Sequence, residues 1–145
     1  MTRTSMALSG LALLGMTVSA GAFAATMSSV NVSMTGEGTG KMAIAVDQAS
    51  VKAGRVTFVV KNDAIGEKHE FVVLKLAKPG AELPYDAAKD KVVESKAKKL
   101  GEVEDVAPGG TKNLTLDLKP GSYQLICNMK GHYMAGMSAL VTVTK

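Results

Sequence analysis

The chain has 145 residues, with 17 basic and 13 acidic side chains and a formal net charge of +4. This excess of positive charge is too small to indicate a protein that binds nucleic acid. The single cysteine excludes an internal disulfide, and the length suits one domain around one hydrophobic core.

The first 24 residues predict a secretory signal peptide that is cleaved after about Ala24. Arg3 precedes an apolar run over residues 8–18, and a small-x-small pattern leads to the expected cleavage site. The apolar run is too short for a comfortable membrane span. We therefore expect a periplasmic or otherwise exported protein without stable membrane insertion, in which residues 25–145 form one domain.

Alternating apolar and polar residues predict a series of short strands after the signal peptide. The expected strands cover residues 29–34, 41–46, 55–61, 70–76, 111–118, 123–127 and 139–144. Turns rich in glycine and proline, such as Pro120-Gly121, separate several of these strands. Short strands joined in this way are typical of an all-β sandwich or barrel.

One segment departs from the strand pattern. Residues 83–100 are rich in alanine, lysine and glutamate, and Tyr85, Ala88 and Val92 follow a roughly helical spacing. We therefore predict a helix inserted between two strands. Its lysines offer a possible docking surface, but a charge run more often marks a solvated face.

Three residue types that bind soft metals lie in one short stretch before the last predicted strand. Cys127, His132 and Met137 follow one another at intervals of five residues. Thiolate, imidazole and thioether together select copper, and a blue-copper centre needs one further imidazole. The only other histidine is His69, between two predicted strands. Each residue alone more often has a structural role, but the joint spacing predicts one type 1 copper ion bound by these four side chains.

The pattern Y-x-L-x-C-x4-H-x4-M over residues 123–137, together with the upstream His69, resembles the cupredoxin family of small blue-copper proteins. The Cys-to-His interval is similar to that of azurins, and the His-to-Met interval to that of rusticyanin and auracyanin. The resemblance covers essentially all of residues 25–145. It implies an eight-stranded Greek-key β-sandwich with copper near one end.

The resemblance also implies roles for individual residues. His69, Cys127 and His132 correspond to the equatorial ligands, and the Gly136-Met137 pair favours Met137 over Met134 as the axial ligand. In many family members Asn or Ser follows the first histidine and braces the metal loop, whereas here Glu70 follows it. The His69–Glu70 pair is therefore the main departure from the family pattern.

The ligand counts restrict the possible functions. Two histidines and one cysteine cannot build type 2, trinuclear or binuclear copper centres, and no Ser-His-Asp arrangement or phosphate loop is apparent, so we do not expect an enzyme. We expect a monomeric, soluble electron carrier that cycles between Cu(I) and Cu(II). Its partners would be redox proteins such as a cytochrome or a terminal oxidase or reductase. The alternative is a copper-sequestering or copper-delivery protein for copper homeostasis or resistance, which Met27, Met34, Met42 and Glu70 support.

Overall fold

The computed structural model describes residues 27–38 and 40–145, so the expected signal peptide over residues 1–24 lies outside the described part of the chain. The described residues form eleven strands and one turn of 3-10 helix. In chain order these are β1 (Met27–Thr35), β2 (Ala43–Val46), β3 (Ser50–Lys52), β4 (Gly54–Asn62), β5 (His69–Lys75), β6 (Tyr85–Asp86), β7 (Lys91–Val92), η1 (Glu94–Lys96), β8 (Lys98–Val106), β9 (Thr111–Leu118), β10 (Gly121–Ile126) and β11 (Ser138–Thr144).

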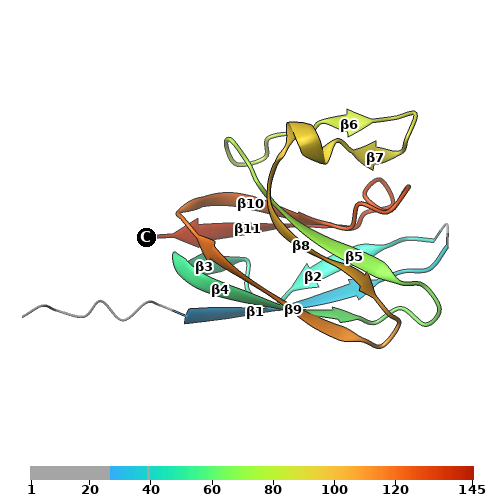
Figure 1. Cartoon of the computed structure of the whole chain (residues 1–145), viewed down its shortest axis with the longest axis horizontal. Coiled ribbons are helices and arrows are strands. Elements are labelled where there is room, and N and C mark those ends of the chain that lie inside the picture. The colour runs from blue at the N-terminus through green and yellow to red at the C-terminus, as the bar shows by residue number, and fades with distance from the viewer. Residues whose placement is uncertain (1–26, 39) are drawn as a thin grey trace, which may run out of the picture.

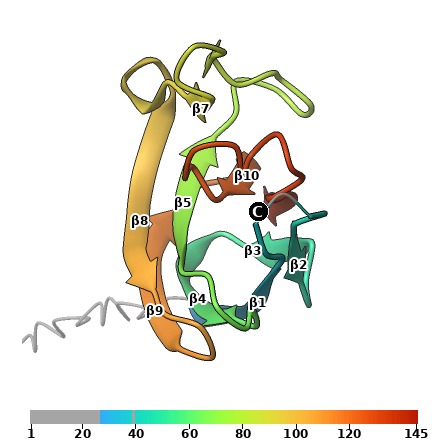
Figure 2. The same cartoon turned by 90° about the vertical axis from the view of Figure 1, so that its right-hand side faces the viewer.

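Nine of the strands form two sheets that face each other (Figures 1 and 2). The four-stranded sheet has the order β2-β1-β4-β9, and the five-stranded sheet has the order β3-β11-β10-β5-β8. The expected all-β sandwich is therefore confirmed, with one more strand in its two main sheets than the family resemblance implied. Within the described ranges no helix is long and apolar enough to cross a bilayer.

The core lies between the two sheets and follows from the alternation of side chains along each strand. Val30 and Val32 of β1 are buried beside Phe58 and Val60 of β4, their partners in the register. Phe71 of β5 reaches Phe58 from the other sheet, with 5.5 Å between the ring centroids. Burial of each such side chain contributes about 1.5–3 kcal/mol to folding.

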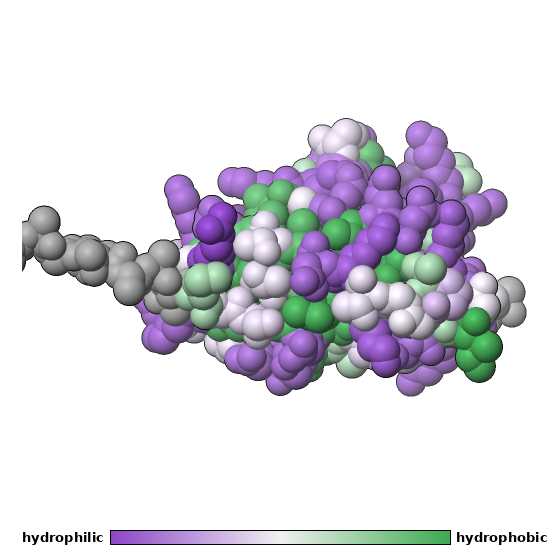
Figure 3. Space-filling view, turned by 60° about the horizontal axis from the view of Figure 1, so that its bottom comes forward, coloured by the Kyte–Doolittle hydropathy of each residue, from purple (hydrophilic) through white to green (hydrophobic). Residues whose placement is uncertain are grey.

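The outer face of the four-stranded sheet carries the polar half of the same alternation. Thr57 of β4 and Thr115 of β9 share a hydrogen bond of 2.9 Å between their hydroxyl oxygens. Figure 3 shows hydrophilic residues on this side of the molecule, with smaller hydrophobic areas between them. This face is therefore a solvated surface, whereas the inner face supplies half of the core.

The helix predicted over residues 83–100 is wrong. The segment instead forms the β6–β7 hairpin, the short η1 and the beginning of β8. Local side-chain bonds favour a turn, because the Asp86 carboxylate accepts hydrogen bonds from the backbone N–H groups of Ala88 and Lys89. Asp90 then adopts a φ of 55°, which no α-helix contains.

Packing against the outer face of the five-stranded sheet also explains why the helical spacing misled. A second apolar cluster contains Val72, Leu74, Val92 and Ile126, with Leu83, Tyr85, Ala97 and Tyr133 packed against it. Tyr85 and Val92 are cross-strand partners in the β6–β7 hairpin, so their shared contact with this cluster reflects pairing rather than one helical face. Tertiary contacts have overridden the helix propensity of alanine, lysine and glutamate.

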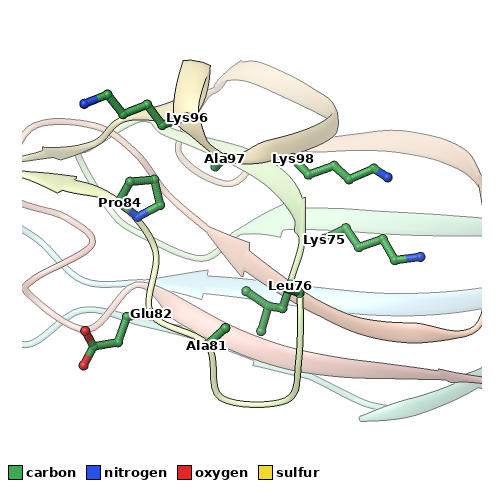
Figure 4. Close-up of a pocket in the computed structure, with 9 residues that line it drawn as sticks. Lys75, Leu76, Ala81, Glu82, Pro84, Lys96, Ala97 and Lys98 are labelled. Atoms are coloured by element: carbon green, nitrogen blue, oxygen red, sulfur yellow. The ribbon is translucent and has the colours of Figure 1, made fainter.

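The lysines of this segment do not converge on one point. Lys99 donates hydrogen bonds of 2.7 Å to both Glu94 and Glu102, and these bonds raise the pKa of Lys99. Lys96 and Lys98 border a cleft of about 410 Å³ between the β5–β6 loop and β8. Figure 4 shows Lys98 extending in the same direction as Lys75, whereas Lys96 extends the opposite way. This arrangement suits solvated lysines.

Candidate metal centre

Three of the four predicted ligands meet at one end of the sandwich. His69 begins β5, Cys127 directly follows β10, and His132 lies in the β10–β11 loop. Because β5 and β10 pair antiparallel, with Val72 opposite Ile126, the start of one strand adjoins the end of the other. The ligand atoms of the two histidines and the cysteine all lie within 4.8 Å of one another.

The distances among these donor atoms fit one metal ion. His132 Nδ1 lies 3.3 Å from His69 Nδ1 and 3.4 Å from Cys127 Sγ. In a trigonal centre with metal bonds of about 2.0 Å to nitrogen and about 2.3 Å to sulfur, donors are separated by roughly 3.5–3.8 Å. These two separations therefore need to open by only a few tenths of an ångström for the donors to hold an ion.

Burial controls the protonation of the donors. The Cys127 thiol is fully buried, and desolvation raises its pKa to about 11, against the opposing effect of the backbone N–H groups of Met129 and Glu70. The same two N–H groups are placed to stabilise a thiolate once a metal displaces the proton. Metal binding must therefore release this proton, so affinity is expected to rise with pH.

His69 is held in the neutral form that a metal ligand requires. Burial is the main cause that lowers its pKa, and the nearby His132 adds to the effect. Its Nε2 is a buried polar atom that makes no hydrogen bond of normal geometry within the described residues. The Gly36 backbone is near enough to favour a proton on the ring. A ring with its proton on Nε2 leaves the Nδ1 lone pair free to bind a metal.

The β10–β11 loop is folded by its own backbone and by two glycines. His132 C=O accepts the backbone N–H of Met137 at 3.0 Å, and Met137 C=O accepts that of Cys127 at 3.2 Å. Gly131 and Gly136 have φ values of 84° and 109°, which favour glycine. At Gly136 an added Cβ would lie 2.7 Å from a backbone oxygen of another segment. The loop thus returns the chain from His132 to the base of the site.

The two candidate axial methionines have opposite environments. Met137 is fully buried in the same core cluster as Cys127, whereas the side chain of Met134 is 65% exposed. The backbone bond between Cys127 and Met137 holds these two residues side by side. The axial role of Met137 stays a prediction, and its burial next to a ligand is consistent with it.

Glu70 points away from the donors, because successive side chains of β5 face opposite sides of the sheet. Burial is the main cause that raises its pKa, and Lys91 and the backbone N–H of Asn128 lower it. The Glu70 carboxylate therefore lies toward the hairpin and the residue after Cys127. It lies near the metal loop at the backbone of Asn128.

Asn128 is a structural residue that the sequence did not reveal. Its side chain is buried, its Oδ1 accepts the backbone N–H of Val92 at 2.7 Å, and its Nδ2 donates to Val92 C=O at 3.0 Å. A third bond of 2.7 Å joins Nδ2 to the Glu94 carboxylate. These bonds attach the ligand loop to the β6–β7 hairpin, which lies far from it in sequence.

We expect Asn128→Ala to lower the free energy of unfolding by about 2 kcal/mol, because it leaves buried groups of Val92 without partners. Urea denaturation of the metal-free protein measures this loss. Asn113→Ala is the matched control, since Asn113 is exposed on β9, and it should change stability by no more than about 0.5 kcal/mol. Equal effects of the two substitutions would show that the Asn128 bonds contribute nothing net.

Glu67 is a further residue beside the donors that the sequence did not reveal. His132 is only 6% exposed, and its Nε2 lies 3.2 Å from Glu67 Oε1. A cleft of about 420 Å³ opens beside this pair and is also bordered by Asp90 and Lys130. The His132 ring thus has its Nδ1 directed to the other donors and its Nε2 directed to a carboxylate.

The sequence and the fold of the chain are both similar to those of known proteins. Residues 30–144 match the family described as copper binding proteins, plastocyanin/azurin family. Auracyanin from Roseiflexus castenholzii has a similar structure, with 19% identity, coverage of 83% of this chain and 99% of the other, and a TM-score of 0.56. Auracyanin A from Chloroflexus aurantiacus has 22% identity, with coverage of 82% of this chain and 100% of the other and a TM-score of 0.56. Rusticyanin from Thiobacillus ferrooxidans has 18% identity, with coverage of 80% of this chain and 76% of the other and a TM-score of 0.57.

At these identities the likeness to the solved structures concerns the fold alone. No curated protein sequence matches the chain. The family match and the buried cluster of His69, Cys127 and His132 together fit a single type 1 copper ion.

Proposed function

Because the chain belongs to the plastocyanin/azurin family of copper-binding proteins, we propose that it is a soluble electron carrier whose one copper ion cycles between Cu(I) and Cu(II). The proposed location is the periplasm, which the expected signal peptide over residues 1–24 supports. The observation that carries the proposal is the buried triangle of two imidazole nitrogens and one sulfur at the end of the sandwich.

Each ligand has a distinct proposed task. His69, Cys127 and His132 would hold the ion, and Met137 would supply a weak fourth contact. A bound copper ion takes up and gives up one electron, and this ligand set suits both of its oxidation states. The paired strands β5 and β10 keep two of the donors in place, so little protein movement accompanies each change of charge.

The surface next to His132 is the proposed route for electrons. Met134 is 65% exposed and Tyr133 is partly buried, and both follow His132 in the loop. A partner protein that covers this surface would come close to the His132 imidazole, and through it to the metal. The proposed partner is a second redox protein.

The methionines near the start of the described chain favour the carrier over copper sequestration. Met34 and Met42 are 0% and 1% exposed and belong to the core cluster, so they are unavailable as surface ligands for Cu(I). Only Met27 is exposed, and a lone thioether is a poor copper store. Strand packing therefore explains Met34 and Met42, two of the methionines that supported the alternative function.

Cyclic voltammetry combined with visible spectroscopy on the copper-loaded protein tests the proposal. A carrier should show one reversible one-electron wave and an intense absorption in the oxidised state, and it should keep its copper in both states. A protein that lacks a reversible wave and passes its copper rapidly to a Cu(I) chelator would instead be a copper-handling protein.

The axial assignment predicts a difference between two methionines. Met137→Leu should leave copper bound and coloured but raise the reduction potential, because loss of a weak donor destabilises Cu(II) more than Cu(I). Met134→Leu is the matched control and should leave the potential nearly unchanged, since its side chain is mostly exposed. Voltammetry of both variants decides the matter, and a strong shift with Met134→Leu alone would reverse the assignment.

A further inference from the structure

Glu67 joins three segments at the end of the sandwich that holds the donors. One carboxylate oxygen, Oε1, lies 3.2 Å from Nε2 of His132, and the other, Oε2, accepts the backbone N–H of Gly38 at 2.7 Å. The backbone C=O of Glu67 accepts a bond of 2.8 Å from the side chain of Asn62, a fully buried residue at the end of β4. The carboxylate is therefore fixed from both sides.

A second glutamate ties the same two loops together in the opposite direction. Glu37 belongs to the β1–β2 loop, and its carboxylate accepts the backbone N–H groups of Ile65 and Gly66 in the β4–β5 loop. Glu67 belongs to the β4–β5 loop and reaches the β1–β2 loop. The two residues share the task of joining the loops, but only Glu67 contacts His132.

The His132 ring is therefore held at both nitrogens. Nδ1 faces Cys127 Sγ at 3.4 Å and His69 Nδ1 at 3.3 Å, and Nε2 faces the carboxylate. A hydrogen bond from Nε2–H to a carboxylate fixes the tautomer in which Nδ1 carries a free lone pair, and it makes that nitrogen a stronger donor. The His132 ring is only 6% exposed, so its orientation is set by these contacts.

We propose that Glu67 is a positioning residue for the metal centre: its carboxylate fixes the orientation and tautomer of His132 and strengthens this imidazole as a donor to Cu(II). The inference rests on the proposed function, because it assumes that His132 binds the copper ion. A stronger and more negatively charged donor favours Cu(II) over Cu(I), so Glu67 lowers the reduction potential. It also makes His132 a rigid contact rather than a freely rotating surface ring.

The test compares Glu67→Gln with Glu37→Gln in the copper-loaded protein. Both substitutions remove one negative charge and weaken the connection between the same loops, but only Glu67→Gln alters the group that holds His132. We expect Glu67→Gln to reduce the affinity for Cu(II) relative to Cu(I) about tenfold, which raises the potential by about 59 mV for one electron. For Glu37→Gln the change should stay below about twofold. Equal shifts, or no shift with Glu67→Gln, would overturn the proposal.

A second measurement works without copper. Nitrogen NMR of the His132 ring should show the proton on Nε2 in the wild-type and Glu37→Gln proteins, and a mixture of tautomers in Glu67→Ala. An unchanged ring in Glu67→Ala would contradict the positioning role. If Glu67→Gln folds but fails to load copper while Glu37→Gln loads it, the role is supported. A wild type without a reversible copper wave would refute the proposed function instead, and the tautomer measurement would still judge Glu67.

Discussion

Cys127→Ala is expected to abolish the intense visible absorption of the oxidised copper protein. The colour of such a centre arises from charge transfer between the thiolate sulfur and Cu(II), and this chain has no other cysteine to replace it. The two imidazoles remain 3.3 Å apart at their Nδ1 atoms, so some copper should still bind. Visible spectroscopy together with measurement of the copper content separates loss of colour from loss of metal.

Met129→Ala is the control for this experiment. Met129 lies two residues after Cys127 in the same loop, and its backbone N–H, which acts on the sulfur, survives the substitution. The control variant should therefore keep its colour. Full colour in Cys127→Ala would remove the central claim that this thiolate binds the copper ion.

Copper is expected to raise the melting temperature by more than about 10 °C. A ligand that binds only the folded state at about 1,000 times its dissociation constant adds about 4 kcal/mol of stability, and each kcal/mol shifts the melting temperature of a chain of this size by several degrees. His69→Ala should lose most of the gain, because His69 alone connects β5 to a set of ligands otherwise confined to the β10–β11 region. Thermal melts with and without copper, monitored by circular dichroism, measure the gain.

Lys68→Ala is the matched control for that comparison, since Lys68 is the exposed neighbour of His69. It should retain the full effect of copper. Melts of the wild type that are indifferent to copper would show that the centre is not assembled from these residues.

The sequence predicted the sandwich because the strand pattern was strong. Val30, Val32, Val56, Phe58 and Val60 alternate with polar residues, and all five are buried. Successive side chains of a strand face opposite sides of the sheet, so these alternating apolar residues can be buried together only on one face. The ligand cluster was also predictable, because its residue types are rare in this chain and their order is distinctive.

What could not be predicted depended on contacts between distant segments. The β6–β7 hairpin is held by the side chain of Asn128, 36 residues away from Val92, whereas local composition and spacing predicted a helix. Glu67 drew no attention in the sequence, since one glutamate in a polar loop is ordinary. Only the fold reveals that it faces His132, 65 positions further along the chain.

The pairing of β3 with β11 joins two segments that lie far apart in the sequence. These strands are parallel, with Ser50 opposite Thr142, and the β10–β11 loop that carries most of the donors precedes β11 directly. Contacts between such distant segments form slowly, because a long stretch of flexible chain must first be closed. We therefore expect this pairing to form late in folding. The fold buries the Cys127 thiol completely, so we expect a chain that has not completed its sandwich to expose this thiol to oxidation.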